Sequence, residues 1–244
     1  MPEWKQIRGN LTAISAGSRT NVWGVNAAGN IYKFSGYDDL GTSPWIQIPG
    51  SLSDIGAAAD GTVWGVNAAG NIYRYAGDQE ESADQWVQIP GNLTRIAVGS
   101  RTNVWGVNEA GDIYKFSGYD FLTPSPWIKI PGNLSDIGAA ADGTVWGVNR
   151  NGNIYRYAGD QHNKNHWFEI SGNLTRIAAG SRTNVWGVNS GDDIYSFSGY
   201  DDRTSSPWNQ ITGKLTDIGA AADGTVWGVN RNGNIYRYTG DRQD

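Results

Sequence analysis

Two series of tryptophans recur along this 244-residue chain at a nearly constant spacing. The first series is Trp4, Trp45, Trp86, Trp127, Trp167 and Trp208, and the second is Trp23, Trp64, Trp105, Trp146, Trp186 and Trp227. In both series the successive steps are 41, 41, 41, 40 and 41 residues. A fixed period in the forties with tryptophan anchors is typical of β-propeller blades. The spacing predicts an all-β fold, a six-bladed β-propeller that forms a single domain over residues 1–244.

Each repeat is expected to supply the four strands of one blade. In the first repeat, β-prone runs at residues 11–17, 22–26, 31–34 and 45–48 are divided by turn residues. The sixth repeat ends near residue 244 without a final tryptophan strand, whereas the chain begins with an additional one at Trp4–Ile7. We expect this N-terminal strand to close the last blade, which leaves only short, protected strand edges.

The repeats alternate between two types. Odd repeats contain Gly-Ser-Arg-Thr-Asn-Val-Trp, and even repeats contain Ala-Ala-Asp-Gly-Thr-Val-Trp, which predicts approximate threefold symmetry. The first strand of each repeat carries, at one equivalent position, Ala13, Asp54, Arg95, Asp136, Arg176 and Asp217. These residues form either ion pairs between neighbouring blades or a charged channel mouth. Ion pairing is favoured because the charges nearly cancel around the ring.

Composition narrows the possible partners. A net charge of −5 argues against nucleic acid and anionic membrane surfaces as partners, since both attract basic proteins. There is no cysteine for a disulfide or a thiolate metal site, and no apolar stretch is long enough to cross a membrane. The N-terminus does not resemble a signal peptide, so we expect a cytoplasmic protein or one released without a classical signal.

No group of residues suggests catalysis or a cofactor. An active site needs one asymmetric cluster of acid, base or nucleophile, and no such cluster interrupts the repeats. The two histidines, His162 and His166, share a polar loop. A metal site there lacks a third ligand, so a solvated loop is favoured. The Asp-x-Asp-x-Asp-Gly calcium pattern is also absent. We therefore predict a non-enzymatic protein without a metal or other cofactor.

The motifs Trp-x-x-Ile-x-Gly-x-Leu and Val-Trp-Gly-Val-Asn-x-x-Gly-x-Ile-Tyr resemble tectonin repeats over Trp4 to Asp244. The similarity is greatest to the tectonin lectins of mushrooms. It implies a multivalent lectin of innate defence that binds glycans on foreign bacterial or nematode surfaces, O-methylated sugars in particular. Several copies of one weak site on a rigid body increase avidity for such a surface. The sequence leaves open whether the protein forms a homo-oligomer.

A comparison of the six repeats within the chain indicates where a ligand binds. The turns between the second and third strands differ among repeats, whereas Ser-Arg-Thr-Asn and a later Gly-Tyr-Asp are identical in all odd repeats. The carbohydrate-binding candidates are Arg19, Asn21, Tyr37, Asp38, Arg101, Asn103, Tyr119, Asp120, Arg182, Asn184, Tyr200 and Asp201, with Asp78, Asp160 and Asp241 in the even repeats. Arginine, asparagine and aspartate would bind hydroxyls, and tyrosine would form a wall. The alternative is that Ser-Arg-Thr-Asn is simply a turn.

Several alternatives stay open at this level. Arg74, Arg156 and Arg237 lie between tyrosines on the third strand and either stack on a ring or reach a pocket between blades. The number of sites is three if odd-type loops bind alone and up to six if every groove between blades binds. The tryptophans of the Val-Trp-Gly motif are expected to pack between blades. A protein-interaction scaffold is the alternative function, and a glycosidase, which needs paired carboxylates, is third.

Overall fold

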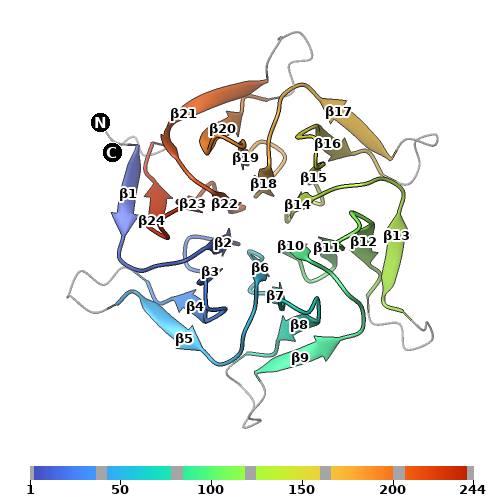
Figure 1. Ribbon diagram of the computed structural model, residues 1–244, viewed down its shortest axis with the longest axis horizontal. Helices are drawn as coiled ribbons and strands as arrows, with labels where there is room; N and C mark the ends of the chain where they lie inside the picture. Colours follow the sequence, from blue (N-terminus) through green and yellow to red (C-terminus); the bar gives the residue numbers. More distant parts are fainter. Residues whose placement is uncertain are drawn as a thin grey trace.

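The computed structural model describes residues 3–36, 43–77, 85–118, 125–159, 166–199 and 207–240. Within these ranges the chain forms six four-stranded antiparallel sheets arranged as a ring around a central axis (Figure 1). Each sheet is one blade, with its strands ordered outward from the axis. This confirms the six-bladed β-propeller predicted from the repeat.

Blades 1 to 5 each use four consecutive strands, and blade 6 combines β22, β23 and β24 with β1. The innermost strands are β2 (Ala13–Ala16), β6 (Asp54–Ala57), β10 (Arg95–Ser100), β14 (Asp136–Ala139), β18 (Arg176–Ala179) and β22 (Asp217–Ala220). The second strands are β3 (Val22–Val25), β7 (Val63–Val66), β11 (Asn103–Val107), β15 (Val145–Val148), β19 (Val185–Val188) and β23 (Val226–Val229). The third strands are β4 (Ile31–Phe34), β8 (Ile72–Tyr75), β12 (Ile113–Phe116), β16 (Ile154–Tyr157), β20 (Asp193–Phe197) and β24 (Ile235–Tyr238). The outermost strands are β5 (Trp45–Ile48), β9 (Trp86–Ile89), β13 (Trp127–Ile130), β17 (Trp167–Ile170), β21 (Trp208–Lys214) and β1 (Trp4–Ile7).

The N-terminal strand closes the ring, as the sequence predicts. β1 pairs antiparallel with β24, so that Trp4 lies opposite Tyr238 and Ile7 lies opposite Ile235. The backbone N–H of Thr239 donates to the carbonyl of Glu3 at 2.8 Å and continues this pairing by one residue. The sixth blade is therefore built from both ends of the sequence (Figure 1).

The core lies between the blades. Side chains alternate along each strand between the two faces of a sheet, so every blade packs against both neighbours. Trp64 of blade 2, for example, meets Phe116 and Trp127 of blade 3 with ring centroids 4.9 and 6.0 Å away. The six tryptophans of the Val-Trp-Gly series are at most 5 % exposed. This confirms that their rings pack between blades, and edge-to-face ring pairs of this kind add stability beyond area burial.

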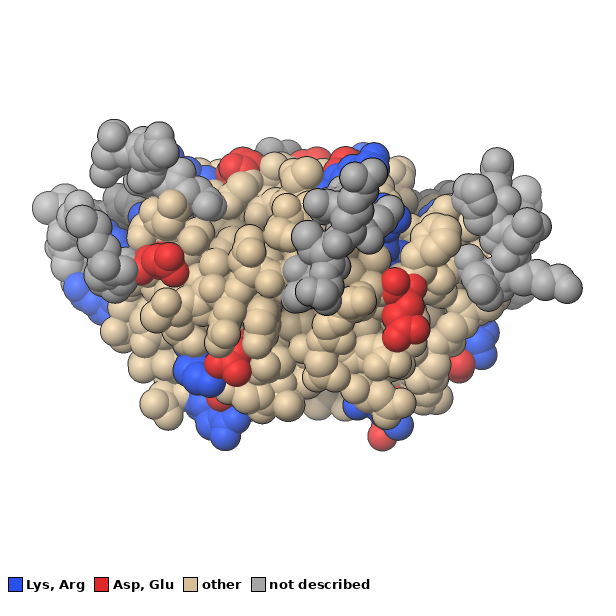
Figure 2. Space-filling model, turned by 90° about the horizontal axis from the view of Figure 1, so that it is seen from above, with Lys and Arg blue, Asp and Glu red and all other residues tan. Residues whose placement is uncertain are grey.

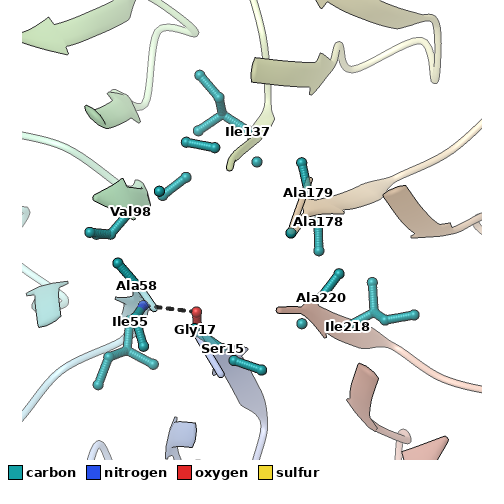
Figure 3. Close-up of a pocket in the computed structure, with 18 of the residues that line it drawn as sticks. Ser15, Gly17, Ile55, Ala58, Val98, Ile137, Ala178, Ala179, Ile218 and Ala220 are labelled. Atoms are coloured by element: carbon teal, nitrogen blue, oxygen red, sulfur yellow. Dashed lines mark hydrogen bonds between the residues drawn. The ribbon is translucent and has the colours of Figure 1, made fainter. Parts of the chain in front are cut away.

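The central channel is narrow and lined mainly by small or aliphatic residues (Figure 3). It encloses about 70 Å³. Ser15 of blade 1 accepts a hydrogen bond from the backbone N–H of Ala57 of blade 2 at 2.9 Å, drawn as the dashed line in Figure 3. The channel offers little room and few polar side chains, so a drug- or sugar-sized ligand is not expected inside it.

The charged residues of the innermost strands form ion pairs between blades, as favoured from the sequence. Arg95 Nη1 lies 3.1 Å from Asp54 Oδ1, and Arg95 Nε lies 3.7 Å from Asp136 Oδ1. Arg176 Nε lies 3.9 Å from Asp217 Oδ1. Ala13 stands where the alternation requires a third arginine. Burial raises the pKa of Asp217 to about 7, although the nearby Arg176 guanidinium lowers it.

Seen edge-on, the visible rim of the propeller is mostly uncharged (Figure 2). Lysine and arginine side chains lie in small groups close to aspartate and glutamate rather than in one continuous field. Binding to a polyanion such as nucleic acid uses a basic patch or stripe, and this view contains none. The described residues contain no helix long and apolar enough to cross a membrane.

Candidate ligand-binding grooves between the blades

Two kinds of blade boundary alternate around the ring. We call a boundary odd when it follows an odd-numbered blade (1–2, 3–4, 5–6) and even when it follows an even-numbered blade (2–3, 4–5, 6–1). The two kinds contain equivalent strands. They differ because the turn between the first two strands is Ser-Arg-Thr-Asn in odd blades and Ala-Asp-Gly-Thr in even blades.

At an odd boundary, an asparagine side chain joins the two blades. Asn21 Nδ2 donates to the carbonyl of Ala58 in the next blade at 2.7 Å, and Asn21 Oδ1 accepts from Trp23 Nε1 at 2.8 Å. Asn103 and Asn184 make the same pair of hydrogen bonds. The blades approach closely here, since a Cβ on Gly99 would lie 2.1 Å from the Ala140 carbonyl oxygen. Glycine at this position permits the approach.

At the even boundary between blades 2 and 3, the turns leave an open groove of about 450 Å³. It is lined by Asp60, Gly61, Thr62, Trp64, Arg74 and Tyr75 of blade 2 and by Arg101 of blade 3. Asp60 Oδ2 accepts from the backbone N–H of Arg101 at 2.8 Å and so joins the two blades at the rim. Burial alone would raise the pKa of Asp60. The hydrogen bonds from the N–H groups of Arg101 and Thr62 outweigh it and hold this pKa below its usual value, so the groove contains a carboxylate.

The other even boundaries repeat this arrangement. Asp142 accepts from the Arg182 N–H at 2.7 Å, and Asp223 accepts from the Arg19 N–H at 2.7 Å. The residue types that line the groove at boundary 2–3 recur at boundaries 4–5 and 6–1 at equivalent positions. The inner strands repeat as well, because Asp54, Asp136 and Asp217 each accept a backbone N–H of the following blade at 2.8 Å. The even boundaries are thus related by approximate threefold symmetry, as predicted.

The tryptophan N–H groups separate the two kinds of boundary. Nine of the twelve indole N–H groups donate to an oxygen of the protein. The three others belong to Trp64, Trp146 and Trp227, one at each even boundary, and these buried Nε1 atoms have no hydrogen-bond partner. The reason is local, since Thr62, Thr144 and Thr225 occupy the place of the asparagine in odd repeats. A buried donor without a partner is uncommon and calls for an explanation.

The structure places the predicted site residues unequally. Arg19, Arg101 and Arg182 are exposed at the even boundaries, beside the aspartate of the preceding blade. Asn21, Asn103 and Asn184 lie at the odd boundaries, where both polar atoms of each amide bind within the protein. The two parts of each Ser-Arg-Thr-Asn motif therefore face different grooves. The remaining candidates, Tyr37, Asp38, Asp78, Tyr119, Asp120, Asp160, Tyr200, Asp201 and Asp241, lie outside the described residues.

The structure also locates Asn26 and the arginines of the third strand, which were discussed from the sequence. Asn26 of Val-Trp-Gly-Val-Asn accepts the N–H groups of Ala28 and Asn30, so it shapes the turn between the second and third strands rather than the groove. Arg74 lines the groove, whereas Arg156 Cζ lies 5.9 Å from the ring centroid of Phe168. Both roles left open for these arginines therefore occur. Sequence reasoning overlooked the unpaired indoles, although the exchange of asparagine for threonine is visible in the repeats.

Metal binding has little support among the described residues. They contain no group of three histidine, aspartate or glutamate side chains that could hold an ion. His166 stacks on Tyr157 at a centroid distance of 6.4 Å, and His162 lies outside the described residues. The groove at boundary 2–3 instead presents an indole N–H donor, two guanidinium groups and a carboxylate, which are groups that can form hydrogen bonds with a polar organic ligand.

A family model named Tectonin domain matches the chain twice, over residues 1–125 and 119–244. The chain belongs to the tectonin family. The two matches together cover all six repeats of this tectonin, and a search of curated protein sequences returned no match. The family assignment therefore rests on the repeat pattern that also predicted the fold.

Solved structures similar to this tectonin are varied β-propellers. The Cps50 (Swd1) propeller domain of Myceliophteria_thermophila matches with a TM-score of 0.61 and 7 % identity over 97 % of this chain and 99 % of that one. A streptogramin B lyase matches with a TM-score of 0.60 and 15 % identity, covering 96 % of each chain. YCF48 bound to D1 peptide matches with a TM-score of 0.57 and 15 % identity over 99 % and 96 % of the two chains. At such identities the similarity extends to the fold alone.

Proposed function

We propose that this tectonin is a multivalent, non-enzymatic lectin whose ligands bind in the grooves between blades. The observation that supports this most directly is the groove at boundary 2–3, which combines Trp64, Asp60, Arg74 and Arg101 in a volume of about 450 Å³. A site of this kind suits a sugar, because hydroxyl groups both donate and accept hydrogen bonds while the faces of the ring carry C–H groups.

Repetition of the groove supports a repetitive ligand. The same residue types line the equivalent positions at three boundaries. A binding surface for one folded protein partner would use different residues at different blades, whereas a glycan-coated surface presents many identical ligands. Weak sites on one rigid ring then act together and increase avidity by up to about 10²- to 10⁴-fold.

The finer proposal is that the ligands are O-methylated glycans of bacterial or nematode surfaces and that the protein serves in innate defence of a fungus. The resemblance to mushroom tectonin lectins supports this source and role. A methyl ether adds one carbon that a groove can bury, which is worth about 0.8 kcal/mol.

A glycan array with matched methylated and unmethylated sugars tests the lectin proposal. We expect binding to glycans that persists in EDTA, with no release of reducing sugar from the bound ligand. A peptide array probed in parallel tests the alternative function of a protein-interaction scaffold. Binding to peptides without binding to any glycan would reject the lectin, and release of sugar would indicate a glycosidase.

A further inference from the structure

The even grooves share an unpaired indole N–H but differ at their outer edge. On one face of each blade, three residues lie side by side on the second, third and outermost strands, in the cross-strand register of the sheet. In blade 2 they are Trp64, Arg74 and Val87, and in blade 4 they are Trp146, Arg156 and Phe168. In blade 6 the row is Trp227, Arg237 and Lys5. Cross-strand neighbours on one face form a continuous surface.

We call the outermost residue of each row the lip of its groove. Val87 and Phe168 are 42 % and 48 % exposed, although both are large and apolar. Lys5 occupies the lip at boundary 6–1 and is also exposed. Neither apolar lip belongs to a core cluster between blades. These two side chains therefore contribute little to the packing between blades.

The odd grooves lack this combination. Their indole N–H groups already donate to asparagine, and the ammonium groups of Lys33 and Lys115 lie 5.6 and 5.5 Å from the indole centroids of Trp23 and Trp105. Blades 1 and 3 do have exposed apolar residues at the lip, Ile46 and Ile128, whereas blade 5 has Asn209. The pairing of the indole N–H is therefore what separates these odd blades from blades 2 and 4. An unpaired indole N–H together with an apolar lip occurs only after blades 2 and 4 among the described residues.

We propose that the grooves after blades 2 and 4 are the high-affinity sites of the protein, each for a sugar that carries a small apolar substituent. Trp64 or Trp146 donates its indole N–H to a ligand oxygen at the floor of the groove, and Val87 or Phe168 covers the apolar substituent at the lip. This inference rests on the proposed lectin function and assigns its specificity to individual residues.

Geometry sets the size of the ligand. Neighbouring strands are about 4.8 Å apart, so the indole and the lip, two strands apart, are separated by about 10 Å. A sugar that touches both ends is longer than one pyranose ring, so each site takes a disaccharide with the substituent on its outer unit. The indole nitrogen lies at the groove floor, and small side-chain adjustments of the kind common on binding bring a ligand oxygen to it.

Two measurements with mono-O-methylated disaccharides and their unmethylated parents test the proposal. In ¹⁵N-labelled protein, we expect the indole N–H signals of Trp64 and Trp146 to shift on addition of sugar, while those of Trp23 and Trp105 stay in place. In calorimetry we expect two high-affinity sites per chain. A disaccharide with a 6-deoxy outer unit serves as a second probe, because its C6 methyl group supplies an apolar group without a methyl ether.

Lip variants provide the mutational test. The double change Val87→Asn and Phe168→Asn copies the natural residue of blade 5 and should weaken binding of the methylated sugar about fourfold, to the level of the parent. Lys5→Val should raise the number of high-affinity sites from two to three. Ala68→Ser, at the opposite end of blade 2, is the matched control and should change neither.

The outcomes separate this inference from the lectin function. If the wild-type protein binds no sugar in any form, the proposed function fails and this inference fails with it. If it binds sugars but the lip variants keep the preference for the methylated or deoxy ligand, or the Trp64 and Trp146 signals do not respond at saturation, only the assignment of these residues is overturned.

Discussion

Blade 2 is held from its two sides by different means. On the side of blade 1, the amide of Asn21 crosses the boundary and also satisfies the N–H of Trp23. On the side of blade 3, the crossing groups are carboxylates: Asp54 and Asp60 accept backbone N–H groups of blade 3, and the N–H of Trp64 is left unpaired. Both kinds of boundary are therefore joined by polar groups, but only the even boundary of blade 2 leaves an indole N–H without a partner in the protein. Substitutions at the two kinds of boundary should separate folding from binding.

The largest effect should come from deleting residues 1–8, which removes a wall from both boundaries of blade 6. Trp4 packs against Trp186 of blade 5 at 6.2 Å, and Ile7 is buried. Loss of this strand and its pairing should cost several kcal/mol and lower Tm by about 10 °C or more. Differential scanning calorimetry measures this change. A peptide of residues 1–8 added in trans should restore part of the loss, and an unchanged Tm would contradict the closure of the ring.

Asn103→Ala should produce the next largest effect. The change leaves the Trp105 N–H and the Ala140 carbonyl without partners, which costs about 2 kcal/mol of unfolding free energy. Chemical denaturation measures the loss, and calorimetry should find the number of sugar sites unchanged. Thr62→Ser, at the equivalent position of an even repeat, is the control and should stay within about 0.5 kcal/mol. A change in site number with intact stability would show that the odd boundaries bind ligand.

The even boundary 6–1 should respond to pH. The pKa of Asp217 lies at about 7, above its ordinary value of 3.8, so the folded state retains a proton that the unfolded state loses. Stability contributed by this proton is present at about pH 4 and is lost as the pH rises towards 7. Ala13→Arg places a guanidinium in the vacant position of the ring, beside Asp217 and Asp54. It should lower this pKa, and each unit of lowering adds about 1.4 kcal/mol at pH 8.

Denaturation of the wild type and of Ala13→Arg between pH 4 and 8 tests this expectation. The variant should lose less stability than the wild type over that range. Ala13→Gln, of similar length but uncharged, is the control and should keep the decline of the wild type. Equal slopes for all three proteins would show that Asp217 does not titrate in this range.

Arg101→Ala should have the smallest effect on stability, within about 0.5 kcal/mol, because its side chain is exposed and its backbone N–H still donates to Asp60. It should weaken ligand binding in one groove only.

The triple change of Arg19, Arg101 and Arg182 to alanine should reduce binding to a glycan-coated surface by much more than three times the single effect in free energy, since avidity depends on several sites. Surface plasmon resonance measures both. A folded triple variant with unaltered binding would exclude the arginines from the site.

Much of the fold follows from the sequence because the repeat is nearly regular. The predicted runs 31–34 and 45–48 coincide with β4 and β5, and the predicted run 22–26 contains β3. The candidate binding site was harder to predict from the sequence than the fold. Arg101 and Asn103 are two residues apart, and a linear pattern assigns them to one site. Arg101, however, lies in the turn before β11, and the two residues contact opposite neighbouring blades. Trp64 lacks a hydrogen-bond partner because of the turn that faces it, and the sequence does not show which turn that is. Val87 looks like any other strand residue in the sequence, and only the structure shows that it is exposed.

The pairing of Trp4 with Tyr238 also affects how the protein folds. This contact spans almost the whole sequence, and long-range contacts of this kind slow folding because a large loop must close before they form. Before it forms, blade 6 exposes the edge of β24, which any free β1 strand can occupy, including that of another molecule. Refolding at high concentration should therefore yield strand-exchanged dimers, and dilution before refolding should favour the monomeric ring.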